Sequence, residues 1–150
     1  MIKKTFNACG LLILLSMLML SCKKDGIGNL SKDALTNTSW QEMTTGYNRV
    51  LIFEAGGKIT ILIKASQFAD WNIKLTGKYV INGNNLEATV TEQSERNGSG
   101  PVTTTAVNYK WFDQGKFTIK NSVLTVNYKT YPADAPVDTE TKFSQIIPID

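Results

Sequence analysis

Residues 75–91, LTGKYVINGNNLEATVT, decide the fold of this chain. Two β-rich runs, residues 75–81 and 86–91, flank the four turn residues 82–85, NGNN. Glycine and asparagine tolerate the positive φ angles that tight hairpin turns require. One face of the second run carries only apolar side chains, those of Leu86, Ala88 and Val90. Because such alternation is typical of a strand with one buried face, the stretch predicts an antiparallel β-hairpin.

Similar pairs of runs occur on both sides of this hairpin. Residues 49–53 and 58–64 flank the glycine-bearing turn 54–57, and residues 117–120 and 123–129 flank the short turn 121–122. Three further runs have strand character: residues 39–43, 102–112 and 142–148. Short turns between successive strands favour an antiparallel up-and-down meander of about 8–9 strands. We therefore expect an all-β barrel, because closure removes exposed sheet edges, with a two-sheet β-sandwich as the alternative.

Alternation also predicts which side chains face the interior. The other expected interior positions are Ile59, Ile61, Ile63, Val107, Tyr109, Trp111, Phe117, Ile119, Leu124, Val126 and Tyr128.

Composition and charge exclude several classes of function. The chain has 150 residues, which suits one domain, and contains no histidine, so zinc and serine–histidine chemistry are not expected. Its net charge is +3, but two of the 16 basic residues, Lys3 and Lys4, lie in an apparent leader. Since 14 basic and 13 acidic side chains would then remain, nothing indicates a nucleic-acid partner.

The N-terminus has the form of a signal peptide. Lys3 and Lys4 precede an almost unbroken apolar run, residues 6–20, which is too short for an ordinary membrane-spanning helix. Residues 18–22, LMLSC, resemble the lipobox of bacterial lipoprotein precursors, with Met19 in place of the usual leucine. The resemblance implies cleavage before Cys22 and attachment of acyl chains to its sulfur. Secretion without a lipid, or a retained membrane anchor, is the alternative.

This organisation predicts three segments. Residues 1–21 form the signal peptide, residues 22–37 a lipidated polar tether, and residues 38–150 the β-barrel domain. Residues 22–26, CKKDG, resemble the start of mature lipoproteins in the Bacteroidota, which implies the cell envelope and the outer membrane. The periplasmic face and the cell surface both stay open. Cys9 lies in the leader, so the mature chain holds no second thiol that could form a disulfide with Cys22.

The mature chain resembles the small lipocalin-like domains of Bacteroidota lipoproteins. The residues that carry the resemblance are Leu35, Trp40, Phe53, Gly56, Gly57, Gly77, Tyr79, Ile81, Gly83, Asn84, Leu86, Phe117, Ile119, Asn121, Leu124 and Val126. The glycine that usually precedes the tryptophan is replaced here by Asn37 and Thr38. The resemblance implies a barrel with Trp40 plugging one end, although an ordinary core tryptophan would be buried in the same way.

Two sets of aromatic residues are candidate sites. Expected interior rings could line a pocket for a small apolar ligand, or fill a solid core: Tyr79, Tyr109, Trp111, Phe117 and Tyr128. Phe68 and Trp71 lie three residues apart in a polar connection, where they suit a lid or a partner surface, or fold back onto the core.

No motif indicates catalysis or a cofactor. The sequence shows no paired nucleophile and base and no phosphate-cradling glycines, and the acidic residues of segment 131–138 lack calcium-ligand spacing. We therefore expect no enzyme, no cofactor and no metal. The leading hypothesis is a membrane-anchored lipoprotein that binds a small apolar ligand in the cell envelope. The alternative is a protein–protein interaction module that binds an envelope protein through its loop aromatics.

Overall fold

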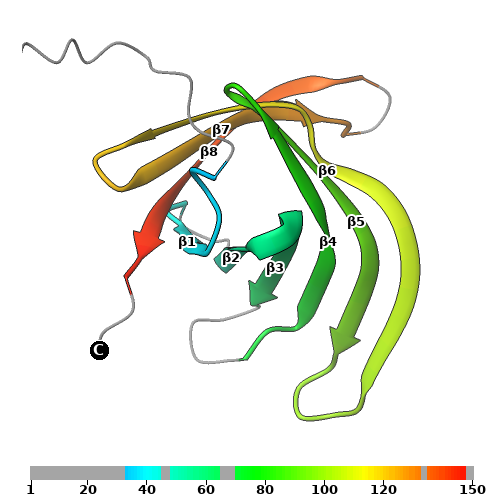
Figure 1. Cartoon of the computed structure of the whole chain (residues 1–150). Helices are drawn as coiled ribbons and strands as arrows, with labels where there is room; N and C mark the ends of the chain where they lie inside the picture. Colours follow the sequence, from blue (N-terminus) through cyan, green and yellow to red (C-terminus); the bar gives the residue numbers. More distant parts are fainter. Residues whose placement is uncertain (1–32, 45–47, 65–69, 133–134, 148–150) are drawn as a thin grey trace, which may run out of the picture.

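The computed structural model describes residues 33–44, 48–64, 70–132 and 135–147 (Figure 1). These residues form eight strands and one short 3-10 turn, η2 (Ala55–Gly57). The strands are β1 (Thr38–Glu42), β2 (Asn48–Glu54), β3 (Lys58–Lys64), β4 (Ile73–Asn82), β5 (Asn85–Arg96), β6 (Val102–Lys120), β7 (Val123–Thr130) and β8 (Val137–Ile146).

The strands form one closed antiparallel barrel. Each strand pairs with the next along the chain, and β1 pairs with β8, with Glu42 opposite Phe143. The predicted up-and-down barrel is therefore confirmed, and the described strands do not divide into the two sheets of a sandwich. The hairpin between β4 and β5 turns at Gly83, whose φ of 61° is the left-handed conformation expected from the NGNN turn.

Strand β6 joins two runs that the sequence predicted as separate strands. It extends over 19 residues and passes through an irregularity at Asp113–Lys116, where its register with β7 shifts. Gln114 adopts a positive φ of 51°, and a Cβ on Gly115 would lie 2.3 Å from the carbonyl oxygen of Leu86. These two residues therefore form a bulge inside one strand rather than the end of a strand.

The apolar core fills the end of the barrel that carries η2, which we call the closed end. Leu35 and Trp40 are fully buried, and the rings of Phe53 and Tyr79 meet edge to face with centroids 5.0 Å apart. The hydroxyls of Thr36 and Tyr79 lie 3.1 Å apart. Because Leu35 packs into this core, the folded domain begins before Thr38, inside the segment that the sequence assigns to the tether.

The opposite end, which carries the β5–β6 connection at residues 97–101, is flared. Strands β6 and β7 are paired only as far as Asp113 and Lys129, whereas β5 and β6 stay paired as far as Arg96 and Val102. In Figure 1 the β5–β6 hairpin accordingly curves away from the β7–β8 hairpin. The barrel wall opens between these two hairpins.

Candidate functional site

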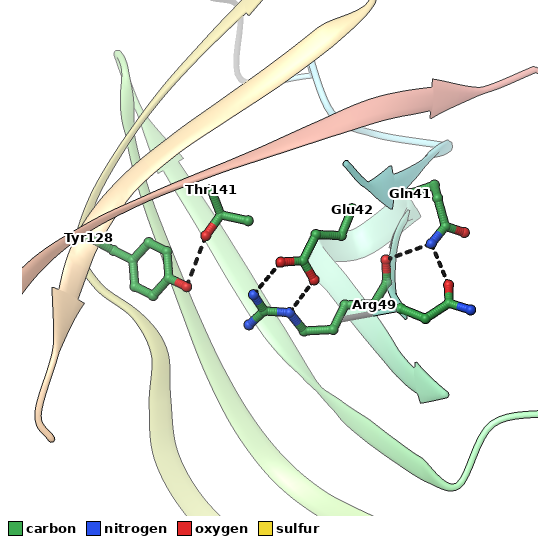
Figure 2. Close-up of polar contacts among 6 residues, drawn as sticks. Gln41, Glu42, Arg49, Tyr128 and Thr141 are labelled. Carbon is green, nitrogen blue, oxygen red and sulfur yellow. Dashed lines mark hydrogen bonds and ion pairs between the residues drawn. The ribbon is translucent and has the colours of Figure 1, made fainter. Parts of the chain in front are cut away.

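An ion pair lies inside the barrel toward the flared end (Figure 2). Arg49 of β2 donates from Nε to Oε2 of Glu42 on β1 over 2.5 Å, and from Nη2 to Oε1 over 2.6 Å. The side chain of Glu42 is 1% exposed and that of Arg49 is 18% exposed. Alternation along β2 places Arg49 on the same inner face as the buried Leu51 and Phe53.

The electrostatics favour the charged form of Arg49. The hydrogen bonds to Glu42 raise the pKa of Arg49 above its ordinary value, although burial acts in the opposite direction. Tyr128 raises the pKa of Arg49 further. The guanidinium carbon also lies 5.8 Å from the centroid of the Trp111 ring, within the range of a cation–π contact. Arg49 therefore connects β1 and β2 to an aromatic side chain on β6.

Several hydroxyl groups on β7 and β8 lie toward the same end of the barrel as Arg49 and Glu42, and we call these hydroxyls and the ion pair together the polar layer. Tyr128 and Thr141 lie with their oxygens 3.3 Å apart, as Figure 2 shows, and the hydroxyls of Thr130 and Thr139 are 2.8 Å apart. The ring of Tyr128 meets Phe112 edge to face at 5.1 Å between centroids. Tyr128 therefore stands at the boundary, with its ring in the apolar core and its hydroxyl in the polar layer.

A hollow of about 420 Å³ lies where β6 separates from β7, and we call it the aromatic hollow. Its lining residues are Tyr109, Lys110, Trp111, Asp113, Lys129, Thr130 and Tyr131. Trp111 also contacts Arg49, so the ion pair inside the barrel lies directly behind one wall of the hollow.

Charges within the aromatic hollow are largely compensated. Tyr131 donates its hydroxyl to Oδ2 of Asp113 over 2.5 Å, and Nζ of Lys110 lies 3.3 Å from the same carboxylate. The hydrogen bond from Tyr131, aided by Lys110, lowers the pKa of Asp113, and Asp113 raises the pKa of Tyr131. Burial raises the pKa of Tyr109. At neutral pH the hollow therefore offers neutral phenols and one carboxylate.

The five expected pocket aromatics separate into two groups. Tyr79 and Phe117 are buried in the core, and neither lines the aromatic hollow. Tyr109 and Trp111 line the aromatic hollow, and the buried Tyr128 lies at the polar layer. Tyr109 is 38% exposed, so its expected burial is wrong, because β6 has left β7 before reaching this residue.

Trp71, the second of the expected loop aromatics, lies beneath an arginine. The guanidinium of Arg96 is 4.9 Å from the centroid of the Trp71 ring, and its Nη2 lies 3.1 Å from Oδ2 of Asp70. Trp71 is half-buried by this contact. Phe68 and the predicted lipidation site Cys22 lie outside the described residues.

Sequence reasoning missed Glu42 and Arg49. Both lie on the inner face, Glu42 two residues after Trp40 and Arg49 two residues before Leu51. This two-residue spacing from buried neighbours could have indicated that both side chains point inward, and a charged side chain that points inward needs a partner inside the barrel. Their mutual pairing depends on the register between β1 and β2, which the sequence alone does not give.

Comparison of the chain with protein-family models, curated proteins and solved structures found no match. Among the described residues, no three histidine, cysteine or acidic side chains gather in a way that could hold a metal ion. No helix in the described ranges has the length and apolar character needed to cross a membrane.

Proposed function

We propose that the protein is a non-enzymatic, lipid-anchored lipoprotein of the cell envelope whose barrel binds a small apolar ligand at the aromatic hollow. The observation that carries the proposal is the opening in the wall between β6 and β7, where Tyr109, Trp111 and Tyr131 line one hollow. The volume of about 420 Å³ is within the range of small-molecule sites. The lipocalin-like resemblance supports the same proposal.

The packing of the barrel decides where the ligand binds. At the closed end Leu35, Trp40 and Phe53 are fully buried, so side chains already occupy the space there. At the flared end, aromatic faces supply apolar contact while Asp113 and the hydroxyl of Thr130 fix orientation by hydrogen bonds. The ligand is therefore apolar over most of its surface and carries a few polar groups.

Arg49 supports this site from behind. Its contact with Trp111 fixes one wall of the aromatic hollow, while Glu42 balances its charge. Because the carboxylate already forms two hydrogen bonds with the guanidinium, Arg49 serves here as a positioning residue for Trp111.

Native mass spectrometry of the protein purified from its own envelope tests the ligand proposal. We expect a small molecule to remain bound to the wild-type chain and to be lost from the Trp111→Ala variant. Val80→Ala is the matched control, because Val80 is 64% exposed on β4 and does not line the aromatic hollow. Equal retention of the molecule by all three proteins would place it elsewhere.

The anchor is tested separately at Cys22. Residues 18–22 carry the lipobox resemblance, and thioether formation needs the cysteine sulfur. Replacement Cys22→Ser should therefore abolish incorporation of labelled palmitate and leave the precursor uncleaved. Cys9→Ser, inside the leader, is the control and should leave labelling unchanged. Labelling that survives Cys22→Ser contradicts the lipoprotein assignment.

The alternative function is an interaction module that engages an envelope protein. One observation favours it: Trp71, one of the two loop aromatics expected to serve such a partner, is half-buried under Arg96 and keeps part of its ring in solvent. Cross-linking within intact envelopes, lost in Trp71→Ala and kept in Trp111→Ala, would favour this alternative over the ligand proposal.

A further inference from the structure

A second hollow, of about 360 Å³, adjoins the aromatic hollow on the outer side of β6, β7 and β8, and we call it the charged hollow. The register places Asn127 of β7 opposite both Lys116 of β6 and Glu140 of β8. Opposed residues project from the same face of a sheet, and this face is the outer one because the adjacent Tyr128 is buried. Lys129 lines both hollows, so the two meet at this side chain.

The charged hollow offers hydrogen-bond donors and acceptors side by side. Its lining includes two amides, two lysines and two carboxylates, those of Gln114, Asn127, Lys116, Lys129, Asp138 and Glu140. An amide both donates and accepts, a lysine donates and a carboxylate accepts. The aromatic hollow instead presents the rings of Tyr109, Trp111 and Tyr131. The groove on one side of Lys129 is therefore polar, and on the other side it is largely aromatic.

The charges of this lining argue against an ionic ligand group. An anion would lie beside Asp138 and Glu140, and a cation would lie beside Lys116 and Lys129. Lys129 and Asp138 already compensate one charge of each sign, with 2.5 Å between Nζ and Oδ1. A hydroxyl carries no charge and can both donate and accept, so a group with several hydroxyls matches the mixed lining.

We propose that the ligand of the aromatic hollow is an amphiphile whose uncharged, hydroxyl-rich head group, of the sugar class, binds in the charged hollow. The inference rests on the proposed function, because the apolar part in the aromatic hollow holds the head group at the adjoining site. Lys116 and Asn127 project side by side from paired strands, so a donor and an amide face neighbouring hydroxyls of one head group.

Four probes that share a phenyl ring test the head group: phenyl β-D-glucoside, phenol, phenyl phosphate and phenyltrimethylammonium. Equilibrium dialysis against the full lipidated chain in phosphatidylcholine vesicles, with protein-free vesicles as the blank, measures each dissociation constant. We expect the wild type to bind the glucoside about 5- to 30-fold more tightly than phenol, because the sugar adds about two hydrogen bonds. The anionic and cationic probes should gain nothing over phenol.

Matched variants on the outer face of β6 and β7 locate the head group. Lys116→Met combined with Asn127→Ala should abolish the advantage of the glucoside over phenol and leave phenol binding unchanged. Retained phenol binding also shows that this double variant is folded. Lys120→Met is the control and should keep the advantage, because Lys120 is exposed on the same strand but does not line the charged hollow.

The outcomes separate this inference from the proposed function. Phenol binding that Trp111→Ala abolishes, without tighter binding of the glucoside to the wild type, would overturn the inference alone. An ionic probe that binds as tightly as the glucoside, or a double variant that keeps the glucoside's advantage, would do the same. A wild-type chain that does not bind phenol would contradict the proposed function and the inference with it.

Discussion

At the scale of single residues, the pair formed by Glu42 and Arg49 costs free energy to bury but holds neighbouring side chains in place. Moving both charges out of water costs more than their attraction usually returns, unless the geometry is good. Two hydrogen bonds of 2.5 and 2.6 Å supply that geometry here. The pair also holds the guanidinium over Trp111. We therefore interpret it as a device that fixes the aromatic hollow rather than as a source of net stability.

This interpretation predicts an asymmetry between single and double substitutions. Glu42→Leu should lower the free energy of unfolding by about 1–3 kcal/mol, less than for a fully buried pair, because the side chain of Arg49 keeps 18% exposure. Combining Glu42→Leu with Arg49→Met should restore most of that loss, since no charge is then left unpaired. Urea unfolding measures both. A double variant no more stable than Glu42→Leu would show that the ion pair itself stabilises the barrel.

The contact between Tyr131 and Asp113 predicts a pH dependence of stability. The pKa of Asp113 is lowered in the folded state, so its contribution is present above its unfolded pKa of about 3.9 and is lost as the pH falls through the folded value. The pKa of Tyr131 is raised, so its contribution is present below about 10 and is lost as the pH rises through the folded value. The stability difference between wild type and Tyr131→Phe should therefore be largest near neutral pH and shrink in both acid and base.

Chemical denaturation at a series of pH values measures this difference. Val137→Ala is a suitable control, because Val137 is also exposed near the flared end and carries no titrating group. A wild-type advantage over Tyr131→Phe that stays constant with pH would contradict the proposed hydrogen bond.

At the scale of elements, the turn between β6 and β7 is strained by its sequence. Asn121 and Ser122 both have positive φ angles, 51° and 58°, as a two-residue type I′ hairpin turn requires. Asparagine tolerates a positive φ, but serine adopts it only at a cost, and glycine is the residue favoured at the second position of such a turn. Ser122→Gly should therefore raise the free energy of unfolding by about 0.5–1 kcal/mol, after the entropy of glycine in the unfolded chain is deducted.

The opposite change at another turn is the control. Gly83 has a φ of 61° in the β4–β5 hairpin, so Gly83→Ala should destabilise the protein by about 1–2 kcal/mol. Thermal unfolding compares the two variants. A destabilising Ser122→Gly would mean that the serine hydroxyl has a role that the backbone conformation does not explain.

The elements also show where sequence patterns succeed and where they do not. The hairpin at Gly83 was predictable because Leu86 and its neighbours alternate with polar residues on a strand with one buried face. The continuation of β5 to Arg96 and the start of β8 at Val137 were not predicted, because the strand runs expected from the sequence end at residue 91 and begin again at residue 142. Buried positions in these segments carry polar residues, such as Ser94 and Thr141, so the pairing leaves no apolar period-2 signal.

At the scale of the whole molecule, the barrel divides into a packed closed end and an open flared end. The fold class followed from hairpins whose contacts are local in sequence. The aromatic hollow could not be predicted in the same way. It exists because β6 extends beyond the end of its partner β7, and the sequence patterns do not give the relative lengths of neighbouring strands. Tyr109 and Trp111 could be named as ligand-binding candidates but not placed correctly, since the expected interior continued along the whole of β6.

This division predicts a gradient of backbone protection. Residues 58–63 of β3 are paired with a strand on each side, whereas among the described residues those at 102–106 of β6 are paired with β5 alone. In hydrogen exchange of the protein, we expect slow exchange over residues 58–63. Over residues 102–106, rapidly exchanging amides should alternate with protected ones, because only the amides directed toward β5 are bonded. Uniform protection of residues 102–106 would mean that another segment covers this edge of β6.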